Sequence, residues 1–141
     1  MAIVNETDAA LRFFGDDLDP KAITSLLLGD PTYCALKGDL RVSKANRSVF
    51  EKTGKWLRTA PREKPGNLQR QIEVLLADLT SDFTVWRDLS SRFRGDIYVG
   101  IFMLGGNEGC DLSAEALKLL ADRGLRLGLE IYSPVDDDDD A

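Results

Sequence analysis

Histidine is absent from this chain of 141 residues. The absence removes the side chain that most often serves as a general base near neutral pH. It also removes the usual serine or cysteine triad and most zinc and copper sites. Any catalysis would have to use carboxylate, lysine, tyrosine or thiolate groups. We therefore predict no catalytic residues, no metal site and no cofactor, and we favour a non-enzymatic role without excluding a catalytic one.

Long apolar segments and a basic N-terminal region are also missing. The longest apolar run, Ile97–Leu104, is far shorter than the roughly 20 residues that a membrane helix needs. We predict neither a membrane span nor a secretory signal, and we expect a cytoplasmic protein. Cysteine occurs only as Cys34 and Cys110, without a CxxC motif. We expect reduced, partly buried thiols, although sequence alone leaves a disulfide between them open.

Charge is unevenly distributed along the chain. The formal net charge is −6, and Asp136–Asp140 supplies five of the negative charges. Between Lys37 and Lys64, nine lysines and arginines stand against three acids. The apolar share of 43% and the charged share of 30% are typical of a globular domain. We predict a single domain over residues 1–135 and a disordered acidic tail over residues 136–141.

The spacing of apolar residues predicts most of the secondary structure. Alternation is typical of half-buried strands, and apolar residues three and four apart are typical of helices. In chain order we expect a strand at 9–14, a helix at 20–28, a short strand at 32–36, a hairpin of 47–50 with 55–59, helices within 67–79 and 83–93, a strand at 96–104, a helix at 113–122 and a strand at 125–132. The overall course of residues 40–52 stays open.

Two helices begin in the same way, in the segments Leu18–Leu27 and Leu112–Ala121. Each segment has a leucine, then a capping residue, Asp19 or Ser113, and a branched apolar residue four positions after the cap. This pattern predicts a side-chain cap with a hydrophobic staple around it. Loss of such a cap lowers stability by ~1 kcal/mol. Asp19 therefore has a structural role that needs no chemistry.

The repeated order of strand, acidic loop, capped helix and returning strand also predicts a topology. Two such units interleave in a ferredoxin-like split β-α-β sandwich of the α+β class. We expect a mostly antiparallel sheet, with the helical segment between residues 67 and 93 inserted between the halves. In this arrangement the first and third long strands are parallel neighbours in the middle of the sheet.

Parallel central strands would bring the loops that follow them to one end of the sheet. The loops would place Asp16, Asp17, Glu108 and Asp111 together, and clustered carboxylates suit Mg²⁺ or Ca²⁺. The spacing matches no EF-hand loop. The structural alternative, capped helix ends with solvated acids, explains the same residue types, and we favour it.

A second group of candidate residues indicates a surface for a partner. It combines cations of the basic segment with two residues of the last strand: Lys37, Arg41, Lys55, Arg58, Glu130 and Tyr132. Aromatic residues among the cations could also stack on single-stranded nucleic acid. However, alternation places Trp56 in the core, and the body of the domain is slightly acidic. We therefore do not expect nucleic acid as a partner.

The chain resembles a known family along nearly its whole length. The matching pieces are LRFFGDDLDPKAITSLLLGDPT from Leu11, KGD from Lys37, TGKW from Thr53, the Leu75-Leu76 helix and LSAEALKLLADRGLRLGLEIY from Leu112. These pieces resemble domain-of-unknown-function family 4279, a set of small bacterial domains without an assigned activity. The resemblance implies a compact bacterial cytoplasmic domain and carries over no catalytic or ligand-binding residue.

Two functional hypotheses remain. The leading one is a non-catalytic module that binds another protein, with an immunity-type protein that neutralises a toxin as one version, because complementary charge speeds association. The alternative is a domain that binds a small molecule or a divalent cation, with or without catalysis. It would use the loops Asp16–Asp19 and Glu108–Asp111.

Overall fold

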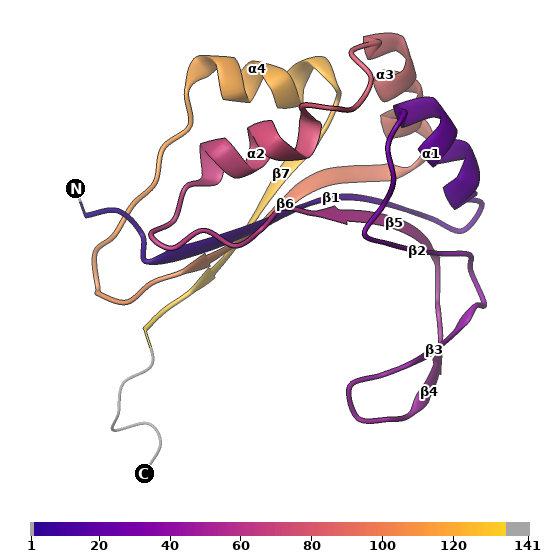
Figure 1. Cartoon of the computed structure of the whole chain (residues 1–141), viewed down its shortest axis with the longest axis horizontal. Coiled ribbons are helices and arrows are strands. Elements are labelled where there is room, and N and C mark those ends of the chain that lie inside the picture. Colours follow the sequence, from indigo (N-terminus) through magenta and orange to yellow (C-terminus); the bar gives the residue numbers. More distant parts are fainter. Residues whose placement is uncertain (1, 135–141) are drawn as a thin grey trace.

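The computed structural model describes residues 2–134 and has one main sheet with helices on a single face (Figure 1). The strands of this sheet are β2 (Tyr33–Ala35), β5 (Gly54–Thr59), β1 (Glu6–Gly15), β6 (Arg94–Phe102) and β7 (Arg126–Tyr132), in that spatial order. The helices are α1 (Pro20–Leu27), α2 (Leu68–Leu76), α3 (Phe83–Arg92) and α4 (Ala114–Asp122). A separate two-stranded hairpin of β3 (Leu40–Val42) and β4 (Ser48–Phe50) extends on the side opposite the helices.

The central strand β1 alternates as its sequence predicts. Thr7, Ala9, Leu11 and Phe13 are buried against the helices, and the residues between them face the open side of the sheet. The ring of Phe13 lies 6.3 Å from that of Trp56 and 6.3 Å from that of Trp86. All three rings are fully buried, so the core forms where β1 and β5 meet α3.

The direction of the central strands differs from the prediction. β6 does lie next to β1, but the two strands are antiparallel, with Glu6 opposite Phe102 and Phe14 opposite Arg94. β1 is also antiparallel to β5, and among the strands of the main sheet in residues 2–134 the parallel pair is β6 and β7, joined by α4. The α+β class and a mostly antiparallel sheet are confirmed. The ferredoxin-like parallel centre is wrong, because the chain enters β6 at the end of the sheet where β1 finishes.

Both predicted helix caps are present. The Asp19 carboxylate accepts a hydrogen bond from the Lys21 backbone N–H at 3.1 Å, and the Ser113 hydroxyl accepts one from the Ala116 N–H at 3.1 Å. The first staple lies in the core. In the second, Leu117 stays 50% exposed and adds nothing to the core. Every helix in residues 2–134 is too short or too polar to span a lipid bilayer.

The hairpin forms between different segments from those predicted. β4 pairs with β3, whereas β5 pairs with β1 and β2. The prediction that residues 47–50 pair with 55–59 is therefore wrong. Gly54 explains part of the preference of β5 for β1 over β4, because a Cβ at this position would lie 2.6 Å from the Gly15 carbonyl oxygen. Only glycine lets β5 come this close to β1.

Candidate functional site

The two acidic loops lie at opposite ends of the main sheet. Asp16 and Asp17 follow β1, Glu108 and Asp111 follow β6, and the two strands run in opposite directions. The prediction that these four acids share one end of the sheet is therefore wrong. Within residues 2–134, no group of three His, Cys, Asp or Glu side chains could hold a metal ion.

Two of these acids have partners within the chain. Asp16 accepts a hydrogen bond from the Lys37 ammonium at 3.2 Å, and contacts with Thr53 and Lys37 lower the pKa of Asp16. Glu108 accepts hydrogen bonds from the backbone N–H groups of Gly105, Leu104 and Asn5. These bonds, that of Gly105 above all, lower the pKa of Glu108. Glu108 thus holds its own loop closed and ties it to the N-terminal segment.

The predicted partner residues do not form one surface either. Arg58 faces the helices and bonds the Asp78 carboxylate at 2.9 and 3.0 Å. Lys37 is exposed at the base of the hairpin, whereas Glu130 and Tyr132 lie on β7, at the far edge of the sheet. Arg41 and Lys55 do come together, and both contact an acidic residue that is not among the predicted site residues.

That residue is Glu51, at the junction between the hairpin and the main sheet. Its side chain is only 3% exposed, and it contacts Arg41 Nε and Lys55 Nζ at 2.7 Å each. It also accepts a hydrogen bond of 2.7 Å from the Tyr33 hydroxyl. Contact with Lys55, followed by that with Tyr33, lowers the pKa of Glu51, and the same bond raises the pKa of Tyr33. An ionised Glu51 thus links β3, β5 and β2.

Backbone bonds complete this junction. The Gly38 N–H donates to the Glu51 carbonyl at 2.8 Å, and the Glu51 N–H donates to the Asp39 carbonyl at 2.8 Å. The Asp39 carboxylate in turn accepts from the Leu36 N–H at 2.8 Å. The base of the hairpin is therefore fixed by both side-chain and backbone contacts, although its strands belong to no larger sheet.

The hairpin itself exposes apolar side chains on one of its faces. In the register of β3 and β4, Leu40 lies opposite Phe50, and Val42 lies opposite Ser48. Leu40 is 60% exposed, Val42 66% and Phe50 67%. We call Leu40, Val42 and Phe50 the hairpin surface. Figure 1 shows the hairpin well away from the helices and from the core that they cover.

The open face of the main sheet carries arginine side chains against aromatic rings. Arg12 lies over the rings of Tyr98 and Phe14, at 4.3 and 5.0 Å from their centroids, and bonds both oxygens of Asp96 at 2.8 Å. Near β7, Arg62 lies over Phe102, whose ring stacks on Tyr132 at 4.8 Å. Arg12 and Arg62 of the open face thus already have aromatic or acidic partners within the chain.

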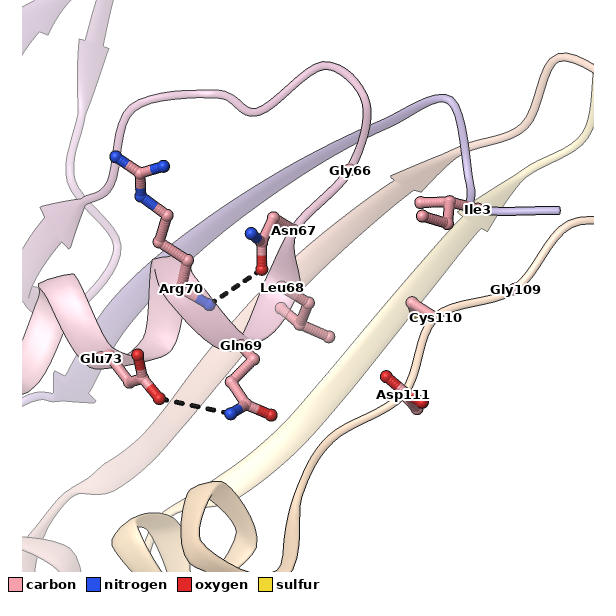
Figure 2. Close-up of a pocket in the computed structure, with 10 residues that line it drawn as sticks. All are labelled: Ile3, Gly66, Asn67, Leu68, Gln69, Arg70, Glu73, Gly109, Cys110 and Asp111. Carbon is pink, nitrogen blue, oxygen red and sulfur yellow. Dashed lines mark hydrogen bonds between the residues drawn. The ribbon is translucent and has the colours of Figure 1, made fainter. Parts of the chain in front are cut away.

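A separate cleft of about 720 Å³ lies between the start of α2 and the loop before α4 (Figure 2). Only Asp111 of the predicted cation ligands lines it. Gln69 there accepts from the Ser113 N–H and donates to Glu73, so these polar groups bond within the chain. Burial, with a smaller effect of Asp111, raises the pKa of Cys110. Cys110 is nevertheless exposed and free, as is Cys34, so the prediction of partly buried thiols is wrong.

The profile of the family described as "Domain of unknown function (DUF4279)" matches residues 5–134. No curated protein and no solved structure matches the chain.

Proposed function

We propose that this chain, which belongs to the family of domains of unknown function DUF4279, is a non-catalytic module that binds another protein through its hairpin surface. The observation that carries the proposal is the exposure of Leu40, Val42 and Phe50, which is 60–67% for each residue. Isolated exposed apolar residues are common, but three on one face of a projecting element are typical of an interaction site.

The charges around the hairpin surface indicate the chemistry of the partner. Lys44 and Arg47 lie on the hairpin, and both are exposed. Lys37 and Lys52 flank its base. An apolar centre with a cationic rim fits a protein groove that is apolar inside and acidic at its edges. The partner that we expect is therefore an acidic protein with such a groove.

The junction at Glu51 supports the same proposal. A two-stranded hairpin is only marginally stable by itself in water. Here the contacts of Glu51 with Arg41, Lys55 and Tyr33 hold its base in place before any partner arrives. A preorganised element loses less conformational entropy on binding, and the affinity rises accordingly.

A site-specific crosslinking experiment tests this function. A photoreactive amino acid replaces Val42 in the full chain, expressed in the cells that produce the protein. We expect one dominant crosslinked protein, identified by mass spectrometry, and its loss when Leu40→Ser and Phe50→Ser are added. Both side chains are mostly exposed, so these substitutions should leave the melting temperature unchanged.

The matched control places the same photoreactive residue at Leu117, which is 50% exposed on α4. It should not capture the protein that Val42 captures. Equal capture from both positions, or capture that survives the two serine substitutions, would show that the hairpin is not the binding surface. The rate of association between the purified partner and the chain should then be measured at low and at high salt. A cationic rim predicts faster association at low salt.

The immunity-type version of this proposal adds that the partner is a toxin. The cationic rim of the hairpin surface supports this version, because it would speed the capture of an acidic toxin surface. If the crosslinked protein arrests growth when expressed alone, co-expression of this chain should restore growth. Co-expression of the variant with Leu40→Ser and Phe50→Ser should not.

A further inference from the structure

The outer edge of β7 is unpaired within residues 2–134, where β7 closes the main sheet. Just after β6, the Met103 N–H donates to the Tyr132 carbonyl at 3.0 Å, so Tyr132 directs its backbone groups toward β6. Backbone direction alternates along a strand. Leu127, Leu129 and Ile131 therefore direct their N–H and C=O groups outward, as a row of free donors and acceptors.

The side chains of β7 do little to protect this edge. Leu129 is 52% exposed and Ile131 60% exposed, both on the face that carries the helices. Proteins commonly block an exposed edge with proline, lysine or a β-bulge. Between Arg126 and Tyr132 there is no proline and no lysine. A seven-residue edge with exposed leucine and isoleucine is therefore well suited to pair with another strand.

We propose that this chain forms a twofold dimer in which β7 pairs antiparallel with β7 of a second copy, centred on Leu129. In this register Leu129 lies opposite itself, Leu127 opposite the partner's Ile131, and Arg126 opposite the partner's Tyr132. Every residue of β7 then pairs within β7. The outward backbone groups of Leu127, Leu129 and Ile131 are those that form the hydrogen-bonded pairs of this ladder.

The side chains in this register complement one another. On the helix face, apolar residues meet apolar residues. On the open face, Arg126 lies against the partner's Tyr132 and diagonally from the partner's Glu130, which gives a cation–π contact and an attractive charge pair. Glu130 itself faces the partner's glycine at position 128. A register centred on Glu130 would instead bring two glutamates together, and one centred on Gly128 would extend beyond the start of the strand.

The dimer leaves the hairpin surface free. The hairpin follows β2, at the edge of the sheet opposite β7. The inference therefore stands independently of the proposed function. A dimer would carry two copies of the hairpin surface at the two ends of one continuous sheet.

The test is the mass of the full chain in solution, measured by light scattering over a concentration series. We expect the mass of two chains, which falls to that of one on dilution. Leu129→Lys and Leu129→Glu should each give the mass of a single chain, because like charges then meet at the twofold axis. An equimolar mixture of the two variants should recover the mass of two chains, because opposite charges then meet there.

Leu40→Lys is the matched control, since it places the same charge on a residue of similar exposure away from β7. It should remain dimeric. Circular dichroism should show that each variant is folded. If the Leu129 variants do not fold, Arg126→Glu replaces them, and repulsion from the partner's Glu130 should again give a single-chain mass. A wild-type chain that is monomeric at every concentration, or variants that stay dimeric, would overturn the inference.

Discussion

At the scale of single residues, Glu51 is the carboxylate on which we expect stability to depend most visibly. Its pKa is held below the usual value, chiefly by Lys55. A carboxyl group with a lower pKa in the folded chain stabilises the fold above its unfolded pKa, and that contribution is lost as the pH falls through the folded pKa. The free energy of unfolding should therefore decrease as the pH falls below the unfolded pKa of glutamate, about 4.3, and through the lower folded pKa.

Glu51→Gln should remove much of this dependence. Loss of the charged contacts should lower the free energy of unfolding at pH 7 by about 1–3 kcal/mol. Urea titrations at pH 7 and pH 4 measure both effects. The difference in the free energy of unfolding between variant and wild type should be smaller at pH 4 than at pH 7. Glu115→Gln changes an exposed acid in the first turn of α4 and is the control that should differ little. A gap of equal size at both pH values would contradict this role of Glu51.

The sequence predicted residues whose roles are local and missed those whose partners are distant. Asp19 and Ser113 were identified because a cap bonds a backbone N–H two or three residues away. Gln71 was not identified, although it is buried and bonds both the hydroxyl and the carbonyl of Thr7. Glu51 is one of three acids within a strongly basic segment, and this imbalance is a signal that could have indicated the junction.

At the scale of the elements, the end of α1 contains an unfavourable backbone conformation. Leu28 has a φ of 64°, in the left-handed region, and its side chain is 71% exposed. Leu28→Gly should therefore raise the free energy of unfolding by about 1 kcal/mol, because glycine adopts this conformation without strain and little burial is lost. Thermal unfolding followed by circular dichroism measures the change.

Leu26→Gly is the control for that prediction. Leu26 lies within α1, where glycine lowers helix stability by about 1 kcal/mol, and it is 38% exposed. The two glycine substitutions should therefore shift the melting temperature in opposite directions. A decrease for both would mean that the Leu28 side chain contributes more than its exposure indicates.

Alternation in the sequence located the strands but could not assign their partners or directions. The segments predicted at 9–14, 96–104 and 125–132 all form strands of the main sheet. A period of two identifies the buried face, but it is the same whether a strand runs parallel or antiparallel. The direction of β6 follows from the path through α2 and α3. The partner of β4 follows from contacts at Glu51 and Gly54.

At the scale of the whole molecule, the sequence predicted the α+β class and the family, and the structure adds the order of the strands in the main sheet. β1 has neighbours on both sides, and its partner along Glu6–Phe14 comes from the last third of the chain. A chain that ends at Arg92 lacks β6 and β7, and we expect it to remain unfolded. A narrow range of amide proton shifts in an NMR spectrum and the absence of a cooperative melt would show this.

A chain that ends at Pro134 is the control for the truncation. It retains every strand and helix of the described residues, and it should melt at the same temperature as the full chain. If the chain ending at Arg92 melted cooperatively, the pairing of β1 with β6 would not be necessary for a stable fold.

The pairing of β1 with β6 has a consequence for synthesis on the ribosome. The apolar residues of β1, among them Leu11 and Phe13, leave the exit tunnel long before Arg94–Phe102 is translated. Until then the nascent chain has no partner for the edge of β1 that later pairs with β6. Exposed edges of this kind promote aggregation. The incomplete polypeptide, more than the finished protein, is therefore the form that needs protection by chaperones.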